Sequence, residues 1–365
     1  MSRKLRHDRI LFGSAVLIVL FGLVMIYSAS AMVASQKEGI DNPYYFLARQ
    51  CIWVLAGTAL MFLFMHLELG RLRTPGMVTT VLVLLIATLI LVLFQSAVNG
   101  THRWILLPGF QVQPSEFAKP ALILFLAAWL AQREERINDL TGALLPVLSV
   151  LAIVAGLIVL QPDFGTAATI LLVAGTMLFV AGLSWQRIAL VSAIAMPALI
   201  AMLLSAGYRR DRLLSFLNPE ADPLGKGFQA MQSLIAIGTG GLTGLGIGNG
   251  RQKLFFLPEP HTDFIFSIVG EELGFIGALA VIAVFGIVVW RGLRVAARSR
   301  DRFGYYAALG ITLMIAIQVL INVSVTLCLL PTKGLPLPLI SYGGSSLVAS
   351  MISLGILLNL SQETG

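Results

Sequence analysis

The chain has 365 residues, of which 57% are hydrophobic and only 12% charged, and its mean hydropathy is +0.88. A soluble domain of this length needs about twice that charge to cover its surface, so the composition excludes a soluble enzyme. The formal net charge of +7 does not indicate nucleic acid as a partner, because the basic residues are spread along short segments beside apolar runs.

Unbroken apolar runs recur along the whole chain and predict membrane-spanning helices. Barrel strands are excluded because they are shorter and alternate in hydrophobicity. The first run follows four basic residues without a close cleavage site, so it is expected to remain as a signal anchor. The sequence predicts an all-α polytopic membrane protein, one membrane domain over 1–365, with ten transmembrane helices at 10–32, 45–66, 75–95, 114–131, 142–160, 165–182, 187–207, 265–290, 305–329 and 343–361.

The distribution of basic residues predicts the orientation of these spans. With a cytoplasmic N-terminus, the short inner segments contain fourteen of the 25 basic residues and the short outer segments contain five. Because cytoplasmic loops carry the excess of lysine and arginine, both termini are expected inside and the long loop 208–264, between spans seven and eight, outside. The five outer cations are Lys37, Arg49, Arg103, Lys119 and Lys333.

Proline and glycine are concentrated in the segments that are expected outside. Irregular backbone at membrane depth is tolerated only when it is buried in protein or lines a wet cavity, so these segments are expected to share an outward-opening cavity. Within the long loop, 228–238 predicts a short amphipathic helix on the membrane surface. The glycine-rich run 238–250 matches no nucleotide-binding fingerprint and favours close backbone approach or a flexible gate.

Asp263 is the first candidate functional residue, since it lies in the run LPEPHTDFIF just before an apolar span. His261, two residues earlier, is more typical of a surface histidine than of a ligand. It stays open as a substrate-binding residue, or as a partner of Asp263 around a divalent ion. Glu271 and Glu272 lie about two turns into span eight, and a structural partner such as an outer arginine is expected for them.

Glu116 and Lys119 are three residues apart in the helix that Pro114 is expected to begin, so they share one helix face. They form either a local ion pair or part of a cavity wall in which Lys119 faces an anion. Asp163, in QPDFG between spans five and six, either caps the following helix or lines the same cavity.

The remaining outer cations have two interpretations. Arg49, Arg103 and Lys333 either reach the lipid headgroups or join Lys119 around a phosphate or pyrophosphate. The two cysteines both fall within predicted spans, which implies no disulfide framework. The four histidines lack the spacing of a structural zinc site.

Five stretches carry a resemblance to a known family: NGTHRWI, QPSEFAK, QPDFGT, the loop pattern from NPEADPLGKGF to DFIFSIVGEELG, and LLPTKGLPLPLISYGGSS. On these motifs the chain resembles the SEDS family (shape, elongation, division and sporulation) over nearly its whole length. The most specific stretches are 257–274 and 330–346. The runs LPTKGLPLPLISYGGSS and SIVGEELG look more like the division branch, FtsW, than the elongation branch, RodA.

The resemblance implies a ten-helix enzyme of the bacterial cytoplasmic (inner) membrane that polymerises glycan strands from lipid II, the undecaprenyl-pyrophosphate-linked disaccharide-pentapeptide. It implies a class B penicillin-binding protein as transpeptidase partner, with other division proteins and membrane lipids at the septum. A divalent cation, Mg²⁺ or Mn²⁺, is the candidate cofactor, and no organic cofactor is expected. The family's essential aspartate matches Asp263, and its cavity residues match Arg49, Arg103, Glu116, Lys119 and Asp163.

The chemistry predicted from this resemblance needs one general base. Pyrophosphate leaves readily once its charge is neutralised, unlike the leaving group in glycoside hydrolysis, where two carboxylates act. Asp263 is the predicted base for the acceptor's sugar 4-hydroxyl in a single inverting displacement. The main alternative is a lipid II transporter (flippase), although no convincing internal repeat supports it. A RodA-type polymerase of cell elongation and a purely structural recruiting role are further alternatives.

Overall fold

A computed structural model describes residues 7–36, 42–68, 70, 73–98, 100–108, 110–205, 216, 228–254, 256–331 and 334–363. Lys37, Lys333 and most of the first part of the long loop lie outside the described residues. A helix accounts for most of each predicted span: α1 Arg9–Gln36, α2 Tyr45–His66, α4 Pro75–Leu93, α5 Pro114–Arg133, α6 Leu145–Leu160, α7 Phe164–Val180, α8 Trp185–Ser205, α11 Ile265–Ala297, α12 Arg302–Thr326 and α13 Gly344–Glu363.

Eight helical segments in the described residues are long and apolar enough to cross a membrane, so the chain is a multi-pass membrane protein. The eight segments exclude α7, an apolar helix of 17 residues, and α8. The number ten therefore stays a prediction. The shorter elements are β1 Ile105–Leu107, β2 Phe110–Val112, η1 Glu134–Arg136, η2 Leu140–Leu144 and α10 Phe228–Gly240, with β1 and β2 forming an antiparallel hairpin.

Several of these helices begin at the proline or capping residue that predicts a helix start in the sequence. Pro75 and Pro114 occupy the first turns of α4 and α5, where a proline loses no intrahelical hydrogen bond. Asp139 accepts a hydrogen bond from the Thr141 backbone N–H at 3.2 Å and caps η2. Such signals place helix starts to within a residue or two, because they depend only on neighbouring residues.

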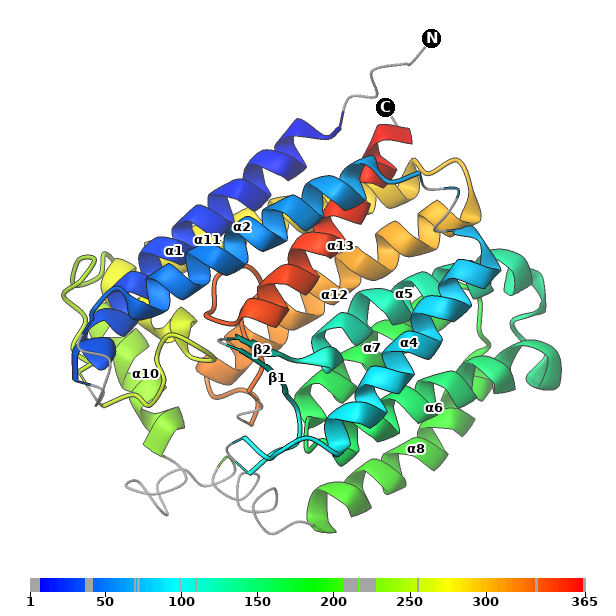
Figure 1. The fold of residues 1–365 in the computed structure, drawn as a ribbon, viewed down its shortest axis with the longest axis horizontal. Helices are drawn as coiled ribbons and strands as arrows, with labels where there is room; N and C mark the ends of the chain where they lie inside the picture. Colours follow the sequence, from blue (N-terminus) through cyan, green and yellow to red (C-terminus); the bar gives the residue numbers. More distant parts are fainter. Residues whose placement is uncertain are drawn as a thin grey trace.

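The two ends of the bundle differ in the loops and ion pairs that they contain. Both chain termini lie at the same end (Figure 1). We call this the termini end; its ion pairs join Asp8 to Arg291 and Arg73 to Glu363. We call the opposite one the loop end. It contains the β1–β2 hairpin, α10, and the segments 241–254, 256–264, 327–331 and 334–343.

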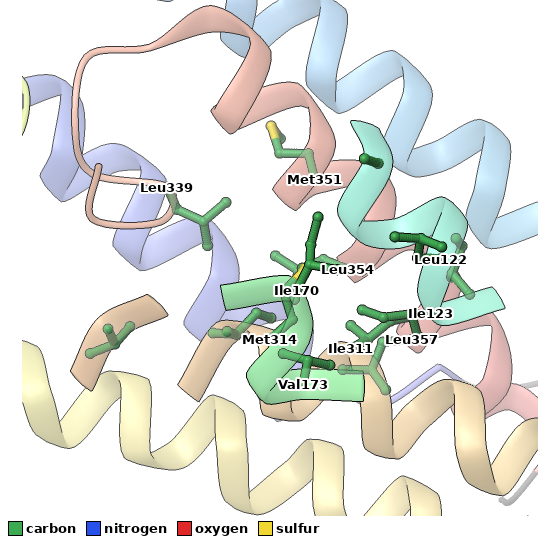
Figure 2. Packing of buried hydrophobic residues seen from close by; sticks show 14 of the residues in the cluster. Leu122, Ile123, Ile170, Val173, Ile311, Met314, Leu339, Met351, Leu354 and Leu357 are labelled. Carbon is green, nitrogen blue, oxygen red and sulfur yellow. The ribbon is translucent and has the colours of Figure 1, made fainter. Parts of the chain in front are cut away.

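The core lies where α5, α7, α12 and α13 meet. Figure 2 shows Leu122 and Ile123 of α5 beside Ile170, Val173, Ile311, Met314, Leu354 and Leu357 from the other three helices. In the apolar part of α13, 89% of the residues are buried, against 22% in α2, so α13 is central and α2 lies at the periphery of the bundle. Small residues permit close helix contact inside a membrane, and a Cβ at Gly355 would lie 2.5 Å from the Met61 carbonyl oxygen.

Two features of the loop end refine the sequence prediction. The predicted short helix is present as α10, and it packs on the bundle: Ser233 Oγ lies 2.6 Å from Ser267 Oγ and donates to the Thr326 carbonyl at 2.7 Å. Span eight was expected to be continuous, but α11 is broken at Gly274, where φ is +67° and ψ is −167°. Glycine adopts this backbone conformation without the steric penalty of a Cβ.

Candidate functional site

Asp263 lies two residues before the start of α11 at the loop end, and it is half-buried. The Asn322 side chain of α12 donates one hydrogen bond to the Asp263 carbonyl at 2.9 Å and another to the Leu335 carbonyl at 2.8 Å. A Cβ at Gly334 would lie 3.4 Å from Asp263 Oδ2. One amide therefore joins two loops that are about 70 residues apart in sequence, and the carboxylate lies beside the second of them.

His261 is buried, with 4% of its surface exposed, so the expectation of a surface histidine is wrong. Its ring centroid lies 4.4 Å from that of Phe46 in α2 and 5.4 Å from that of Tyr342. Its backbone carbonyl accepts a hydrogen bond from the Tyr342 N–H at 2.9 Å. The aromatic contacts keep this histidine within the packed loop end, next to Asp263 in the chain.

Arg49 joins the same group from α2. Its guanidinium carbon lies 4.8 Å from the centroid of the Tyr45 ring, a cation–π contact. Burial raises the pKa of the Tyr342 hydroxyl, and the nearby Arg49, which hydrogen-bonds this hydroxyl, lowers that pKa in part. Because the net shift is upward from 10, Tyr342 stays protonated near neutral pH and its hydroxyl remains able to donate a hydrogen bond.

Asp163 lies in a second group, where it takes the predicted role of a helix cap. Its Oδ1 accepts the Thr166 backbone N–H at 3.2 Å and caps α7. Its Oδ2 accepts hydrogen bonds from Gln113 Nε2 at 3.0 Å and Ser115 Oγ at 3.1 Å. The side chain is 3% exposed, so these neutral donors take the place of water around the carboxylate.

Glu116 and Lys119 form the predicted local ion pair. Lys119 Nζ lies 2.8 Å from Glu116 Oε2, and their side chains are 3% and 4% exposed. Lys119 also lines a narrow slot between α5, α7 and α12, together with Thr169 and Met314. The pair is therefore a desolvated charge pair next to an apolar slot, and it does not reach the lipid headgroups as a surface pair does.

Arg103 is anchored to two backbone carbonyl groups of the protein. Its Nε donates to the Gln161 carbonyl at 2.8 Å, and its Nη2 donates to the Pro162 carbonyl. Gln161 Nε2 in turn donates to the Leu89 carbonyl of α4 at 3.0 Å. Arg103 thus fixes the start of the hairpin segment to the turn that contains Asp163.

The run 341–346, ahead of and into α13, connects the two groups. Tyr342 contacts His261 and Arg49, whereas the Ser345 hydroxyl accepts the Gln113 backbone N–H at 2.9 Å. The structure thus brings Arg49, His261 and Asp263 together, and separately Arg103, Glu116, Lys119 and Asp163, with a bridge between the groups. Lys333 lies outside the described residues.

Sequence reasoning missed the residues that make these connections. Asn322 is an amide inside an apolar span, a signal that points to a buried polar role. Tyr342 and Ser345 lie in ISYGGSS, which carried the resemblance as a motif without a role for either side chain. Gln113 precedes the α5 helix and shows no distinctive pattern, so only the fold identifies it.

The structural partners expected for Glu271 and Glu272 are present, but the cation among them is Lys253 and not an arginine side chain. Glu272 Oε1 lies 2.6 Å from Lys253 Nζ, and Glu271 accepts the backbone N–H of Arg251 at 2.7 Å. Both carboxylates are buried, at 1% exposed or less. Nothing in the sequence shows that the loop folds back onto span eight, so Lys253 could not be predicted as a partner of Glu272.

The described residues contain no group of three His, Cys, Asp or Glu side chains that could hold a metal ion. Mg²⁺ is commonly bound by one or two carboxylates together with substrate phosphates and water. Asp263 fits such a substrate-bridged ion, whereas a site made by protein ligands alone does not fit the described residues. A divalent cation therefore stays a proposal that involves the substrate.

The family model described as a cell cycle protein, for FtsW, RodA and SpoVE, matches residues 8–365. The chain belongs to this family. A "Probable peptidoglycan glycosyltransferase FtsW" of Trichlorobacter lovleyi is 44% identical and covers 98% of this chain and 94% of its own length. "Stage V sporulation protein E" of Bacillus subtilis is 40% identical, covering 99% of this chain and 98% of its own. The predicted SEDS membership is confirmed.

Solved structures agree with this assignment over almost every residue. One chain, from work described as "Structural coordination of polymerization and crosslinking by a peptidoglycan synthase complex", has a TM-score of 0.79 and 33% identity, covering 99% of both chains. The rod shape determining protein RodA of Thermus thermophilus has a TM-score of 0.72 and 29% identity, covering 99% of this chain and 98% of its own. The predominantly helical membrane fold is thus the fold of the family.

Proposed function

We propose that this chain is a peptidoglycan glycosyltransferase that polymerises lipid II into glycan strands for the septal wall during cell division. Relatives named as probable peptidoglycan glycosyltransferases of the FtsW type are 44% and 43% identical and span nearly its whole length. The observation that carries the proposal is Asp263, half-buried beside Gly334 and fixed through Asn322 between two loops that meet at one end of the bundle.

The proposal includes a topology of ten spans with the termini end in the cytoplasm. Arg291, Arg294, Arg298 and Arg302 lie at the termini end of α11 and α12, as the excess of cations on cytoplasmic segments requires. The loop end then faces outward, where the disaccharide heads of lipid II meet. Asp263 would act at this outer surface while the prenyl tails remain in the bilayer.

In the proposed reaction Asp263 is the general base. Its carboxylate takes the proton from the 4-hydroxyl of the acceptor sugar as that oxygen attacks the anomeric carbon of the donor. The bond from this carbon to the pyrophosphate oxygen breaks, and the α-linked donor gives a β-linked product by inversion. General base catalysis of this kind contributes about 10²–10⁴-fold in rate.

Charge on the departing pyrophosphate must be stabilised as it develops. Arg49, Arg103, Lys119 and Lys333 are the proposed cations, with a substrate-bridged divalent ion as a further source of positive charge. Lys119 already contacts Glu116 at 2.8 Å, so its net field is partly cancelled until substrate arrives. Arg103 uses two donor nitrogens on carbonyl groups and retains its Nη1 nitrogen for an anion.

A class B penicillin-binding protein is the proposed partner that cross-links the new strand. The similarity to a chain in a structure of a peptidoglycan synthase complex supports this partner, since that work concerns polymerization and crosslinking. Other division proteins and the membrane lipids complete the proposed surroundings at the septum.

The test is polymerisation of labelled lipid II by the purified full chain in detergent, with and without the transpeptidase, in magnesium, manganese or chelator. The proposal expects long glycan strands from the wild-type chain with its partner, and strand synthesis about 10²–10⁴-fold slower from Asp263→Asn. Normal strand synthesis by Asp263→Asn would overturn the role of the aspartate. A fall in activity in chelator, reversed by either metal, would support the substrate-bridged cation.

A lipid II flippase is the second candidate function, and the break in α11 at Gly274 is the observation that favours it. Transporters commonly place discontinuous helices at their binding sites. Detergent abolishes the two sides of the membrane, so a flippase makes no polymer there. Polymer formed in detergent therefore favours the enzyme, whereas lipid II transfer across vesicles without polymer favours the flippase.

A further inference from the structure

The break in α11 is closed by the loop that precedes it. The freed carbonyls of Glu271 and Glu272 accept the N–H groups of Leu245 at 3.0 Å and Gly246 at 2.9 Å. The first N–H groups after the break, on Phe275 and Ile276, donate at 2.9 and 3.1 Å to carbonyls in the same loop segment. A helix break at membrane depth needs such replacement partners, and the loop supplies them in both directions.

The predicted close backbone approach of the glycine-rich run is confirmed at this contact. A Cβ at Gly240 would lie 2.0 Å from the Gly270 carbonyl oxygen, and one at Gly244 would lie 2.2 Å from the Glu272 carbonyl oxygen. Gly244 also has φ +80°, a conformation that other residues rarely adopt. We call the segment 241–253, hydrogen-bonded along α11, the clip.

Side-chain charges secure the far end of the clip. Lys253 Nζ donates to Glu272 Oε1 at 2.6 Å and to Ser28 Oγ of α1 at 3.1 Å. The Ser28 hydroxyl lies 2.7 Å from both Glu272 oxygens, and Glu271 accepts the Gln252 N–H at 3.1 Å. Glu272 is fully buried and Lys253 is 5% exposed, so the contact has fixed partners and little access to water.

The clip is connected to Asp263 by a short stiff element. The half-helix from Ile265 to the break spans nine residues, or about 13 Å, with Asp263 just before its start and Glu271 and Glu272 at its other end. Resting on the proposed function, we propose that Lys253 and Glu272 are positioning residues, which set the place of the Asp263 carboxylate by fixing both the half-helix and the chain from 253 to 263.

If Lys253 and Glu272 had only a structural role, their replacement would change stability and not catalysis. Buried ion pairs contribute little net stability, because desolvation of the two charges offsets their attraction, and an apolar pair of similar size is often as stable. Removing one partner alone leaves an uncompensated buried charge and destabilises the fold. Replacing both partners separates the roles: stability returns, but the directional contact at 2.6 Å does not.

The experiment measures kcat, KM for lipid II and thermal stability of the full chain with its transpeptidase, for Lys253→Met, Ser28→Ala and the double variant Lys253→Met/Glu272→Leu. The double variant is expected to unfold near the wild-type temperature, with KM unchanged and kcat lowered about 10- to 100-fold, since small misplacements far from the reacting atoms have effects of this size. Ser28→Ala keeps the ion pair and is expected to lower kcat a few-fold.

The matched control joins the same two parts of the chain at the termini end. Asp8, just before α1, pairs with Arg291 of α11, and both side chains are largely buried. The double variant Asp8→Leu/Arg291→Met is expected to keep the wild-type kcat.

Spin labels give a second measurement that does not depend on activity. They are placed at Glu259 and Leu106, on a background with both cysteines replaced by serine. The distribution of distances between the two labels is expected to broaden when Lys253 and Glu272 are both replaced.

Wild-type kcat in the stable double variant overturns the positioning role, and so does an equal fall in the control. If both Lys253 variants fail to fold, Ser28→Ala decides: a lowered kcat at unchanged KM supports the proposal, and a wild-type kcat overturns it. A wild-type chain that makes no polymer contradicts the proposed function instead. The spin-label distances still test the clip in that case, because they need no activity.

Discussion

The two ends of the bundle contain ion pairs of different physical character. At the loop end, the pairs Lys119–Glu116 and Lys253–Glu272 have side chains between 0% and 6% exposed. At the termini end, the pairs of Arg291, Arg73 and Arg302 have side chains between 7% and 66% exposed. Charges at the loop end therefore depend on protein partners, whereas water and lipid headgroups solvate much of the charge at the termini end.

This difference in burial shows which charged side chains need specific protein partners. Asp163 is buried, and its oxygens accept hydrogen bonds from the neutral donors of Gln113, Ser115 and Thr166. At the termini end, orientation in the membrane explains the excess of arginine without any specific contact. Substitutions at matched positions of the two ends test this contrast.

The largest effect is expected for Asp263→Asn compared with Asp301→Asn. Each aspartate lies just before a long helix, Asp263 before α11 at the loop end and Asp301 before α12 at the termini end. Loss of the base is expected to lower the initial rate of lipid II polymerisation about 10²–10⁴-fold without changing thermal stability. The Asp301 variant should polymerise at the wild-type rate, and similar rates for the two variants would contradict the comparison.

The next effect is expected for Lys119→Met, which leaves the Glu116 carboxylate buried without its cation. Such a change lowers the free energy of unfolding by about 3–5 kcal/mol, measured by thermal or denaturant unfolding in detergent. The control Arg302→Met removes a partner of Glu134 from a pair that is 66% exposed on the arginine side, and about 0–1 kcal/mol is expected.

A second variant separates stability from chemistry at this pair. Replacing both residues, Lys119→Met/Glu116→Leu, removes the buried charge and should recover most of the lost stability. Polymerisation is expected to stay low, because Lys119 is a proposed pyrophosphate cation. Full activity in the recovered double variant would show that the pair has a structural role only.

A smaller effect is expected for Asn322→Leu, which removes the donor shared by the Asp263 and Leu335 carbonyls. Leaving a buried acceptor without a partner lowers stability by about 1–3 kcal/mol, and kcat should fall about tenfold as Asp263 shifts. The matched control is Gln318→Leu, one turn earlier on α12. Its buried Nε2 has no hydrogen-bond partner among the described residues, so this variant should be neutral or slightly stabilising. Equal losses would contradict the role of Asn322.

Local patterns predicted the helices closely because each depends on nearby residues. The predicted span 45–66 coincides with α2, and Pro114 begins α5 as expected. The Glu116–Lys119 pair was also predictable, since three residues along a helix place two side chains on one face. The same applies to the Asp163 cap of α7, which needs only the three residues after it.

The missed features all depend on contacts between distant segments. Lys253 meets Glu272 and Ser28 only because the loop folds back on a broken α11, and the break at Gly274 looks like one more apolar residue in a long run. Burial of His261 likewise depends on Phe46, more than 200 residues away. The sequence shows that a glycine-rich loop precedes span eight, but not which backbone it contacts.

The smallest effect is expected for Glu363→Gln at the termini end. Its carboxylate lies 2.6 Å from Arg73 Nη2, but the two side chains are 34% and 36% exposed, and Asp301 lies 3.5 Å from the same nitrogen. Water and the second carboxylate therefore compensate for the lost charge, and the free energy of unfolding should fall by about 1 kcal/mol or less. At about 1 M salt, where the Debye length is near 3 Å, even this difference should vanish. The loss caused by Lys119→Met should persist in the same salt, because ions do not reach a pair that is 3–4% exposed. A loss in Glu363→Gln that is as large and as insensitive to salt would mean that the termini end organises its charges as tightly as the loop end.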